Sequence, residues 1–73
     1  MTNLIEINRQ PVELYKILKF EALVASGGEA KTVINSGLVQ VNGTIETQKR
    51  KKIVDGDSIE FSGQTFLIKY KAD

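Results

Sequence analysis

Cysteine and histidine are both absent from this sequence of 73 residues, which also has only one proline and one methionine. Without cysteine the chain can form no disulfide and no thiolate zinc site. Without histidine it lacks the commonest metal ligand and the commonest general base. Long apolar runs are absent too, so no segment is suited to crossing a bilayer. We therefore expect no catalytic centre, no cofactor or metal, no small-molecule substrate and no membrane partner.

The length is enough for one domain over residues 1–73, with room for only a thin core. The apolar fraction of 41% and the charged fraction of 26% are ordinary for a globular protein, so a disordered chain is not expected. The first residues lack the basic stretch and the long apolar run of a secretory signal peptide. These features predict a small, single-domain, cytoplasmic protein.

The net charge is only +1, but the charges are unevenly distributed along the chain. Residues 1–26 have no net charge, residues 27–52 carry +3 and residues 53–73 carry −2. In the middle third, two glutamates are outnumbered by five basic residues: Lys31, Lys49, Arg50, Lys51 and Lys52. A local basic region on a near-neutral protein is a candidate surface for a polyanionic partner.

The first third of the chain predicts a short strand and a helix. Residues 2–7 alternate weakly between apolar and polar and predict an edge strand. Pro11 suits the first turn of a helix, where its missing N–H costs nothing. One apolar stripe at helical spacing follows, formed by Leu14, Ile17 and Leu18. Lys16 and Lys19 fall on the other side of this helix, which we expect to end around residues 20–23.

A second helix is predicted more sharply. Ser26 and Glu29 have the spacing of a capping box, and Gly37 stands where a left-handed C-terminal cap is wanted. The apolar side of this helix consists of Ala30, Val33 and Ile34. The opposite side consists of Gly28, Lys31, Thr32 and Asn35. This polar side is therefore expected to face solvent or a partner.

The remaining chain has the period of two that is typical of strands. Val39 and Val41 precede Asn42-Gly43, the strongest short hairpin signal, and 44–47 would be the returning strand. Two more strands are predicted over 58–61 and 65–70, with turns at 55–57 and 62–64. The sequence thus predicts an α+β fold in which two short helices pack on a small, mostly antiparallel sheet.

The ordered combination of these signals resembles a known family. It consists of Ser26-Gly27-Gly28-Glu29-Ala30-Lys31, then Ile34 and Gly37, the hairpin of 39–43, and the turn at Gly56-Asp57. It resembles the alpha-L RNA-binding motif, first recognised in the small-subunit ribosomal protein numbered four, over roughly residues 14–61. The double glycine and the short length are most similar to small stand-alone bacterial members, which have no attached enzyme.

The resemblance implies binding to structured RNA, such as ribosomal or transfer RNA, and association with the ribosome. It assigns that surface to the two helices and the adjacent hairpin, through Lys16, Lys19, Lys31, Lys49, Arg50, Lys51 and Lys52. Two positions depart from the family pattern: Gly27 replaces a frequent arginine and Gln40 a frequent basic residue. Both departures remove charge, so they are expected to weaken affinity more than they affect the fold.

Elementary chemistry supports an RNA-binding role for the same surface, although the glycines and the lysines each have a purely structural explanation as well. Gly27 and Gly28 would let a phosphate approach the helix amides, or they only shape the helix entry. Thr32 and Asn35 could bond sugar or phosphate. The lysines could equally form a solvated face. Among the aromatic residues, Phe20 lies off the apolar stripe and is the best candidate for stacking on a base.

Two functions therefore remain open. The first is binding of structured RNA by phosphate neutralisation, which needs no base-specific side chains. The second is a protein–protein adaptor that uses the same basic surface on an acidic partner. Partners that survive complete ribonuclease digestion would favour the adaptor. An enzyme is the least favoured class, because so short a chain offers little room for a deep pocket.

Overall fold

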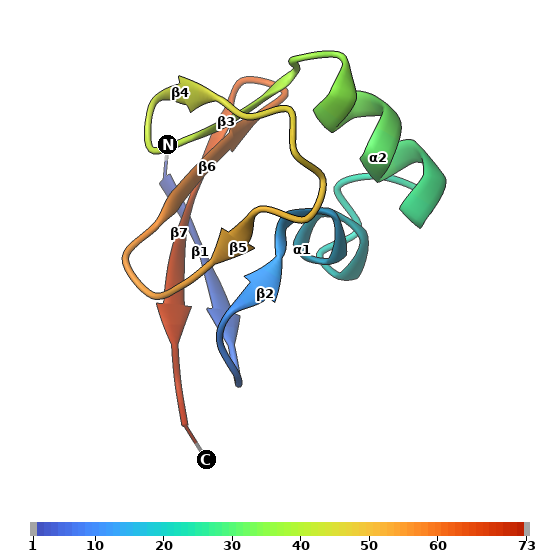
Figure 1. Ribbon diagram of the computed structural model, residues 1–73. Helices are drawn as coiled ribbons and strands as arrows, with labels where there is room; N and C mark the ends of the chain where they lie inside the picture. Colours follow the sequence, from blue (N-terminus) through green and yellow to red (C-terminus); the bar gives the residue numbers. More distant parts are fainter. Residues whose placement is uncertain (1, 73) are drawn as a thin grey trace.

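The computed structural model describes residues 2–72, and they form two helices beside two β-sheets (Figure 1). In chain order the elements are β1 (Thr2–Ile7), β2 (Val12–Glu13), α1 (Leu14–Phe20), α2 (Gly27–Asn35), β3 (Val39–Val41), β4 (Thr44–Ile45), β5 (Lys52–Ile53), β6 (Ser58–Phe61) and β7 (Gln64–Tyr70). The helices lie together at one side of the strands, which confirms the predicted α+β class.

The larger sheet has the strand order β1-β7-β6-β3-β4 and is antiparallel except where β1 runs parallel to β7. β1 is the predicted edge strand, with Leu4 opposite Leu67 in the register. The β3–β4 hairpin turns at Asn42 and Gly43, whose φ angles of 53° and 83° are those that such a turn requires. β4 ends at Ile45 rather than continuing to residue 47 as predicted.

The early end of β4 has a local cause. The carboxylate of Glu46 accepts a hydrogen bond from the Gln48 N–H at 3.0 Å, which turns the chain out of the sheet. A second turn follows, in which the Lys51 N–H donates to the Gln48 carbonyl. The chain between β4 and β5 therefore leaves the main sheet and crosses towards the helices (Figure 1).

The smaller sheet was not predicted and corrects the expectation for Pro11. β2 pairs antiparallel with β5, with Val12 opposite Ile53 and Glu13 opposite Lys52. Pro11 therefore precedes a two-residue strand and lies outside the helix, which begins only at Leu14. Both pairing partners of β2 come from a distant part of the chain, so no local signal in the sequence indicates them.

The start of α1 is held by the backbone of the basic segment, by which we mean Lys49–Lys52. The Leu14 N–H donates to the Lys51 carbonyl at 2.9 Å, and the Tyr15 N–H donates to the Lys49 carbonyl at 3.1 Å. The N-cap residue Glu13 makes no side-chain capping bond. Since the first amides of a helix lack partners within it, these two carbonyls take the place of a cap.

α2 is capped as its sequence predicts. The Ser26 hydroxyl accepts a hydrogen bond from the Glu29 N–H at 3.1 Å, and the Glu29 carboxylate accepts one from the Ala25 N–H. At the other end Gly37 has φ of 78°, and the Leu38 N–H donates to the Val33 carbonyl. These bonds fix both ends of α2 and so fix the direction of its polar side.

The core lies between the helices and the inner face of the main sheet. The predicted apolar residues of α1 are buried, as are Ala30 and Ile34 of α2, while Val33 is half-buried. They meet the inward residues of the strands, which are Ile5, Ile7, Val12, Val39, Val41, Ile53, Ile59, Phe66 and Ile68. Burying each such side chain contributes about 1.5–3 kcal/mol.

Candidate nucleic-acid interface

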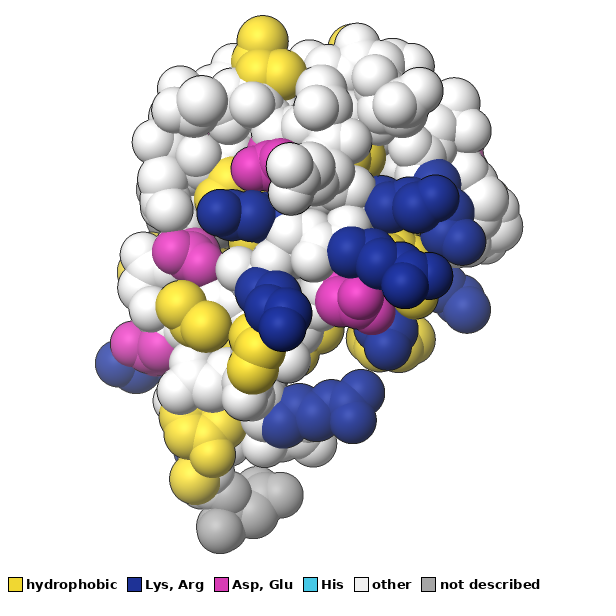
Figure 2. Space-filling model, viewed as in Figure 1, with side chains coloured by type: hydrophobic (Ala, Val, Ile, Leu, Met, Phe, Trp, Pro, Cys, Tyr) yellow, Lys and Arg dark blue, Asp and Glu magenta, His cyan; other side chains and the backbone are white. Residues whose placement is uncertain are grey.

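A groove separates the polar side of α2 from the chain that leads into β5. It has a volume of about 660 Å³ and is lined by Lys31, Thr32, Asn35, Ser36, Thr47, Gln48, Lys49 and Arg50. Three of the predicted residues on α2 thus share one groove with two residues of the basic segment. Figure 2 shows dark blue Lys and Arg side chains gathered over this part of the molecule.

The basic segment is exposed and mostly irregular. All four of its side chains are exposed, and only Lys52 belongs to a regular strand. The alternation that would send neighbouring strand residues to opposite faces therefore does not apply from Lys49 to Lys51. The backbone bonds to α1 fix the carbonyls of this segment and leave its side chains projecting into solvent.

Lys31 connects the two helices at the wall of the groove. Its ammonium nitrogen lies 5.2 Å from the centroid of the Tyr15 ring, within the range of a cation–π contact. Tyr15 is half-buried, and its backbone N–H is one of the two bonded to the basic segment. Tyr15 thus joins α1, α2 and the basic segment, a structural role that its sequence position alone does not indicate.

Glu13 is the acidic residue of this surface. Its carboxylate lies 3.3 Å from the Lys16 ammonium and 4.0 Å from the Arg50 guanidinium. Each of these exposed or half-exposed ion pairs stabilises the protein by no more than about 1 kcal/mol. The main effect of the two ion pairs is to hold Lys16 and Arg50 close together. The Glu13 carboxylate between them lowers the local positive charge by one.

A second, smaller hollow extends the basic surface along α1. It has a volume of about 330 Å³ and is lined by Arg9, Pro11, Val12, Glu13, Lys16 and Lys52. The hollow brings the predicted residues Lys16 and Lys52 together, although they are distant in sequence. It also adds Arg9, which sequence reasoning missed because it precedes the resembling segment and is balanced there by nearby glutamates.

The start of α2 forms a separate place on the surface. A side chain at Gly27 would be in ordinary contact with Lys19, since a Cβ there would lie 3.8 Å from the Lys19 Cδ. The Glu29 N–H at this terminus is already bonded to Ser26, and the Glu29 carboxylate lies beside it. Lys19, Gly27 and Gly28 line neither hollow, and neither does Lys51.

The hydrogen-bonding capacity of α2 is narrower than its sequence suggests. The Thr32 hydroxyl donates to the Gly28 carbonyl at 3.0 Å, so its oxygen is left to accept and not to donate. It can then bond a 2′-hydroxyl of a sugar but not a phosphate oxygen. Asn35 is exposed, and among residues 2–72 its side chain makes no hydrogen bond, so it offers both donor and acceptor groups.

Gln40, one of the two departures from the family pattern, lies away from the groove. It is half-buried in the middle of β3, between Ile45 of β4 and Glu60 of β6. The other departure, Gly27, is at the first residue of α2. The two positions therefore lie in different parts of the molecule, and Gly27 is next to Lys19, another predicted basic residue.

The acidic turn of Asp55–Asp57 is occupied by structural hydrogen bonds. The Asp57 carboxylate accepts from the Val54 N–H at 2.9 Å and from the Asn42 side-chain amide at 3.1 Å. The Asp55 carboxylate accepts from the Tyr70 N–H at 2.8 Å. Within residues 2–72, no three acidic side chains come together as a metal site, and neither helix is long and apolar enough to span a membrane.

Fold and surface together define a class: a small α+β domain in which α2 and the loop before β5 present an exposed basic groove. The family model of the S4 domain matches residues 5–69, and the chain belongs to this family. It is 46% identical over 57 residues to "Putative RNA-binding protein YbcJ" of Escherichia coli (strain K12), covering 78% of this chain and 81% of that protein. The same figures hold for "Uncharacterized protein YbcJ" of Shigella flexneri.

The fold has a solved counterpart. The solution structure of YbcJ from E. coli, described as revealing an alfaL motif involved in RNA-binding, matches with a TM-score of 0.69 and 39% sequence identity. The match covers 90% of this chain and 85% of that one. The predicted resemblance to the alpha-L motif is thereby confirmed, and it extends beyond the residues 14–61 from which it was inferred.

Proposed function

We propose that this protein binds structured RNA, such as ribosomal or transfer RNA, through the groove between α2 and the basic segment. One observation carries the proposal: Lys31 of α2 and Lys49 and Arg50 of the basic segment line the same groove. Lys31 is distant in sequence from the adjacent residues Lys49 and Arg50, and a polyanion bound in the groove would meet cations from both sides. The name of the E. coli relative, the description of its solution structure and the family support RNA as that polyanion.

The geometry suits a paired RNA backbone. Neutralising phosphates releases counterions, which supplies most of the affinity of a surface made of lysine and arginine. Paired RNA is recognised largely by shape, phosphates and 2′-hydroxyls, for which no base-specific side chain is needed. Thr32 as an acceptor and Asn35 as both donor and acceptor match the 2′-hydroxyls beside a phosphate track.

The first prediction concerns salt. With about three to five phosphate contacts, the logarithm of the affinity should fall against the logarithm of salt concentration with a slope of about −2 to −4. The triple variant Lys49→Ala/Arg50→Ala/Lys51→Ala should make this slope shallower by about 2, because Lys49 and Arg50 line the groove and Lys51 does not. It should weaken binding to all RNA sequences similarly. The measurement is fluorescence anisotropy of a labelled, fully paired RNA hairpin in increasing potassium chloride.

A matched pair of single variants gives the control. Lys49→Gln removes one charge from the groove, whereas Lys69→Gln removes one charge from β7 on the main sheet. Only Lys49→Gln should reduce the slope, by about 1. Equal slopes for the two variants, or a slope near zero in the wild type, would contradict the proposal.

A polyglutamate peptide of similar charge tests the adaptor alternative in the same assay. It should compete weakly with the hairpin, because it lacks the phosphate spacing and the 2′-hydroxyls. Competition at concentrations equal to those of unlabelled RNA would indicate a general anion surface instead. If polyglutamate competes only weakly, crosslinking in cells followed by sequencing of the bound RNA identifies the target and distinguishes ribosomal from transfer RNA.

A further inference from the structure

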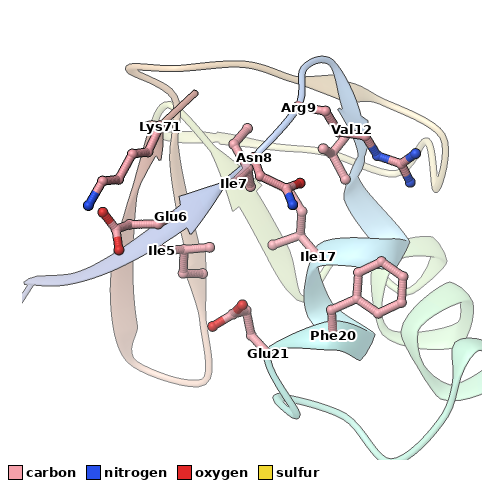
Figure 3. Close-up of a pocket in the computed structure, with 10 residues that line it drawn as sticks. All are labelled: Ile5, Glu6, Ile7, Asn8, Arg9, Val12, Ile17, Phe20, Glu21 and Lys71. Atoms are coloured by element: carbon pink, nitrogen blue, oxygen red, sulfur yellow. The ribbon is translucent and has the colours of Figure 1, made fainter. Parts of the chain in front are cut away.

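A cleft of about 610 Å³ lies between the end of β1 and the end of α1, next to the basic surface but distinct from its groove. Figure 3 shows the residues that line it, drawn from β1, from the chain leading to β2, from α1 and from the residue that follows β7. Neither the predicted site nor the residues of the groove account for this cleft. Its composition combines an apolar floor, an exposed aromatic ring and a mixed polar rim.

The floor is made of core side chains. Ile5, Ile7, Val12 and Ile17 line the cleft and are each at most 9% exposed. They come from β1, β2 and α1, so the floor is held by three elements of the fold rather than by a loop. A flat apolar group placed there would rest on a preformed apolar surface.

Phe20 stands at the side of this floor with 63% of its surface exposed. It is the last residue of α1, whose preceding turn is anchored in the core by Ile17 and Leu18. An aromatic ring so exposed, on a helix so anchored, is available for stacking on a flat partner. In Figure 3 the guanidinium group of Arg9 lies on the same side of the cleft as the Phe20 ring.

The rim carries charges of both signs. Arg9 and Lys71 supply hydrogen-bond donors, and Glu6 and Glu21 supply acceptors. The two carboxylates would repel a phosphate. An aliphatic side chain would give none of the four charged groups a hydrogen-bond partner. A nucleobase has two apolar faces and an edge bearing both donors and acceptors, which is the chemistry that such a rim complements.

We propose that this cleft binds one unpaired nucleobase of the RNA whose paired part occupies the basic groove. The inference rests on the proposed function and deepens it by specifying the substrate: a paired stem with an adjacent bulged or overhanging nucleotide. Arg9 lines both this cleft and the second hollow, which contains Lys16 and Lys52. Glu13 of that hollow lies 4.0 Å from Arg50 of the groove, so the basic surface continues from the groove to the cleft. The base stacks on Phe20 over the apolar floor, while the backbone phosphates of the RNA stay with the lysine and arginine side chains of the basic surface.

The test compares two labelled RNA hairpins, one fully paired and one with a single bulged 2-aminopurine. Stacking should quench the fluorescence of 2-aminopurine when the wild-type protein binds. Phe20→Leu should weaken binding of the bulged hairpin by about five- to a hundredfold and abolish the additional quenching. Phe20→Tyr, which keeps an aromatic ring, should retain both properties, and Phe20→Leu should bind the fully paired hairpin as the wild type does.

The outcomes separate this inference from the proposed function. Equal affinity of the wild type for the two hairpins, or equal weakening of both by Phe20→Leu, would overturn the cleft and leave the groove in place. If the wild type binds neither hairpin, both the cleft proposal and the proposed function are overturned. A second measurement follows the Phe20 ring by NMR during titration with guanosine or adenosine monophosphate. Shifts at Phe20 and Ile17 support the cleft, and unchanged resonances at saturating nucleotide argue against it.

Discussion

The basic segment and the acidic turn are close neighbours along the chain, yet their charged side chains have different roles. The four cations of the basic segment are exposed, whereas Asp57 of the acidic turn is half-buried. In the acidic turn, the carboxylates of Asp55 and Asp57 accept hydrogen bonds from backbone and side-chain donors of the fold. In the basic segment the backbone carbonyls do the structural work, bonding to the amides of α1. Of its four cations, Arg50 alone has a carboxylate within 4.0 Å among the described residues.

This difference teaches which charges belong to the fold and which are available to a partner. A charged side chain whose hydrogen bonds are filled internally mainly contributes stability. A charged side chain projected from a backbone that is bonded elsewhere contributes little to stability and can serve binding. Substitutions at structural charges and at binding charges should therefore affect different measurements. Three variants test this separation: one in the acidic turn, at Asp57, and two beside cations of the basic surface, at Gly27 and Glu13.

The largest effect is expected from Asp57→Ala. The substitution leaves the Val54 N–H and the Asn42 amide without their acceptor, which should destabilise the fold by about 1–3 kcal/mol. The melting temperature should then fall by roughly 4–8 °C for each kcal/mol. RNA affinity measured well below that temperature should not change. Glu60→Ala, on the exposed side of β6, is the control and should melt like the wild type.

A smaller effect is expected from Gly27→Arg, which restores the family's frequent arginine. A Cβ at this position meets only Lys19, at 3.8 Å, and the backbone is not in the left-handed region, so the side chain fits. If RNA reaches the start of α2, the salt slope should steepen by about 1. Gly27→Gln tests the side chain without its charge and should leave the slope as it is. An unchanged slope in Gly27→Arg would restrict the interface to the groove.

The smallest effect is expected from Glu13→Gln. Removing this carboxylate frees Lys16 and Arg50 for phosphate and should tighten RNA binding by up to about fivefold, the equivalent of a surface ion pair. The free energy of unfolding should fall by at most about 1 kcal/mol for each of the two ion pairs that are lost. Titration by anisotropy and a melting curve measure the two effects. Weaker RNA binding in this variant would show that Glu13 positions the cations rather than competing for them.

The local signals of the sequence predicted most of the fold. The capping residues of α2, the Asn42-Gly43 turn and the apolar stripe of α1 depend on neighbours within a few residues, so a pattern in the sequence reveals them. The pairing of β2 with β5 depends on residues about forty positions apart and on only two residues in each strand. That pairing was missed, and with it the true position of Pro11.

The same limit applies to the candidate interface. The sequence indicated Lys31 and the basic segment separately, from their charge and from a family resemblance. What brings them to one groove is the pair of bonds from the amides of α1 to the carbonyls of Lys49 and Lys51. Main-chain bonds of this kind leave no trace in side-chain identity, so neither the groove nor the place of Arg9 could be predicted.

The carbonyls that hold the basic segment against α1 are present whatever side chains this segment carries. Its four positions can therefore accumulate substitutions during evolution with little penalty to folding. A lineage can adjust the strength of its attachment to one polyanion, or transfer that attachment to another, while the scaffold stays as it is. Residues such as Asp57, whose own side-chain atoms hold the chain together, have no comparable freedom to drift.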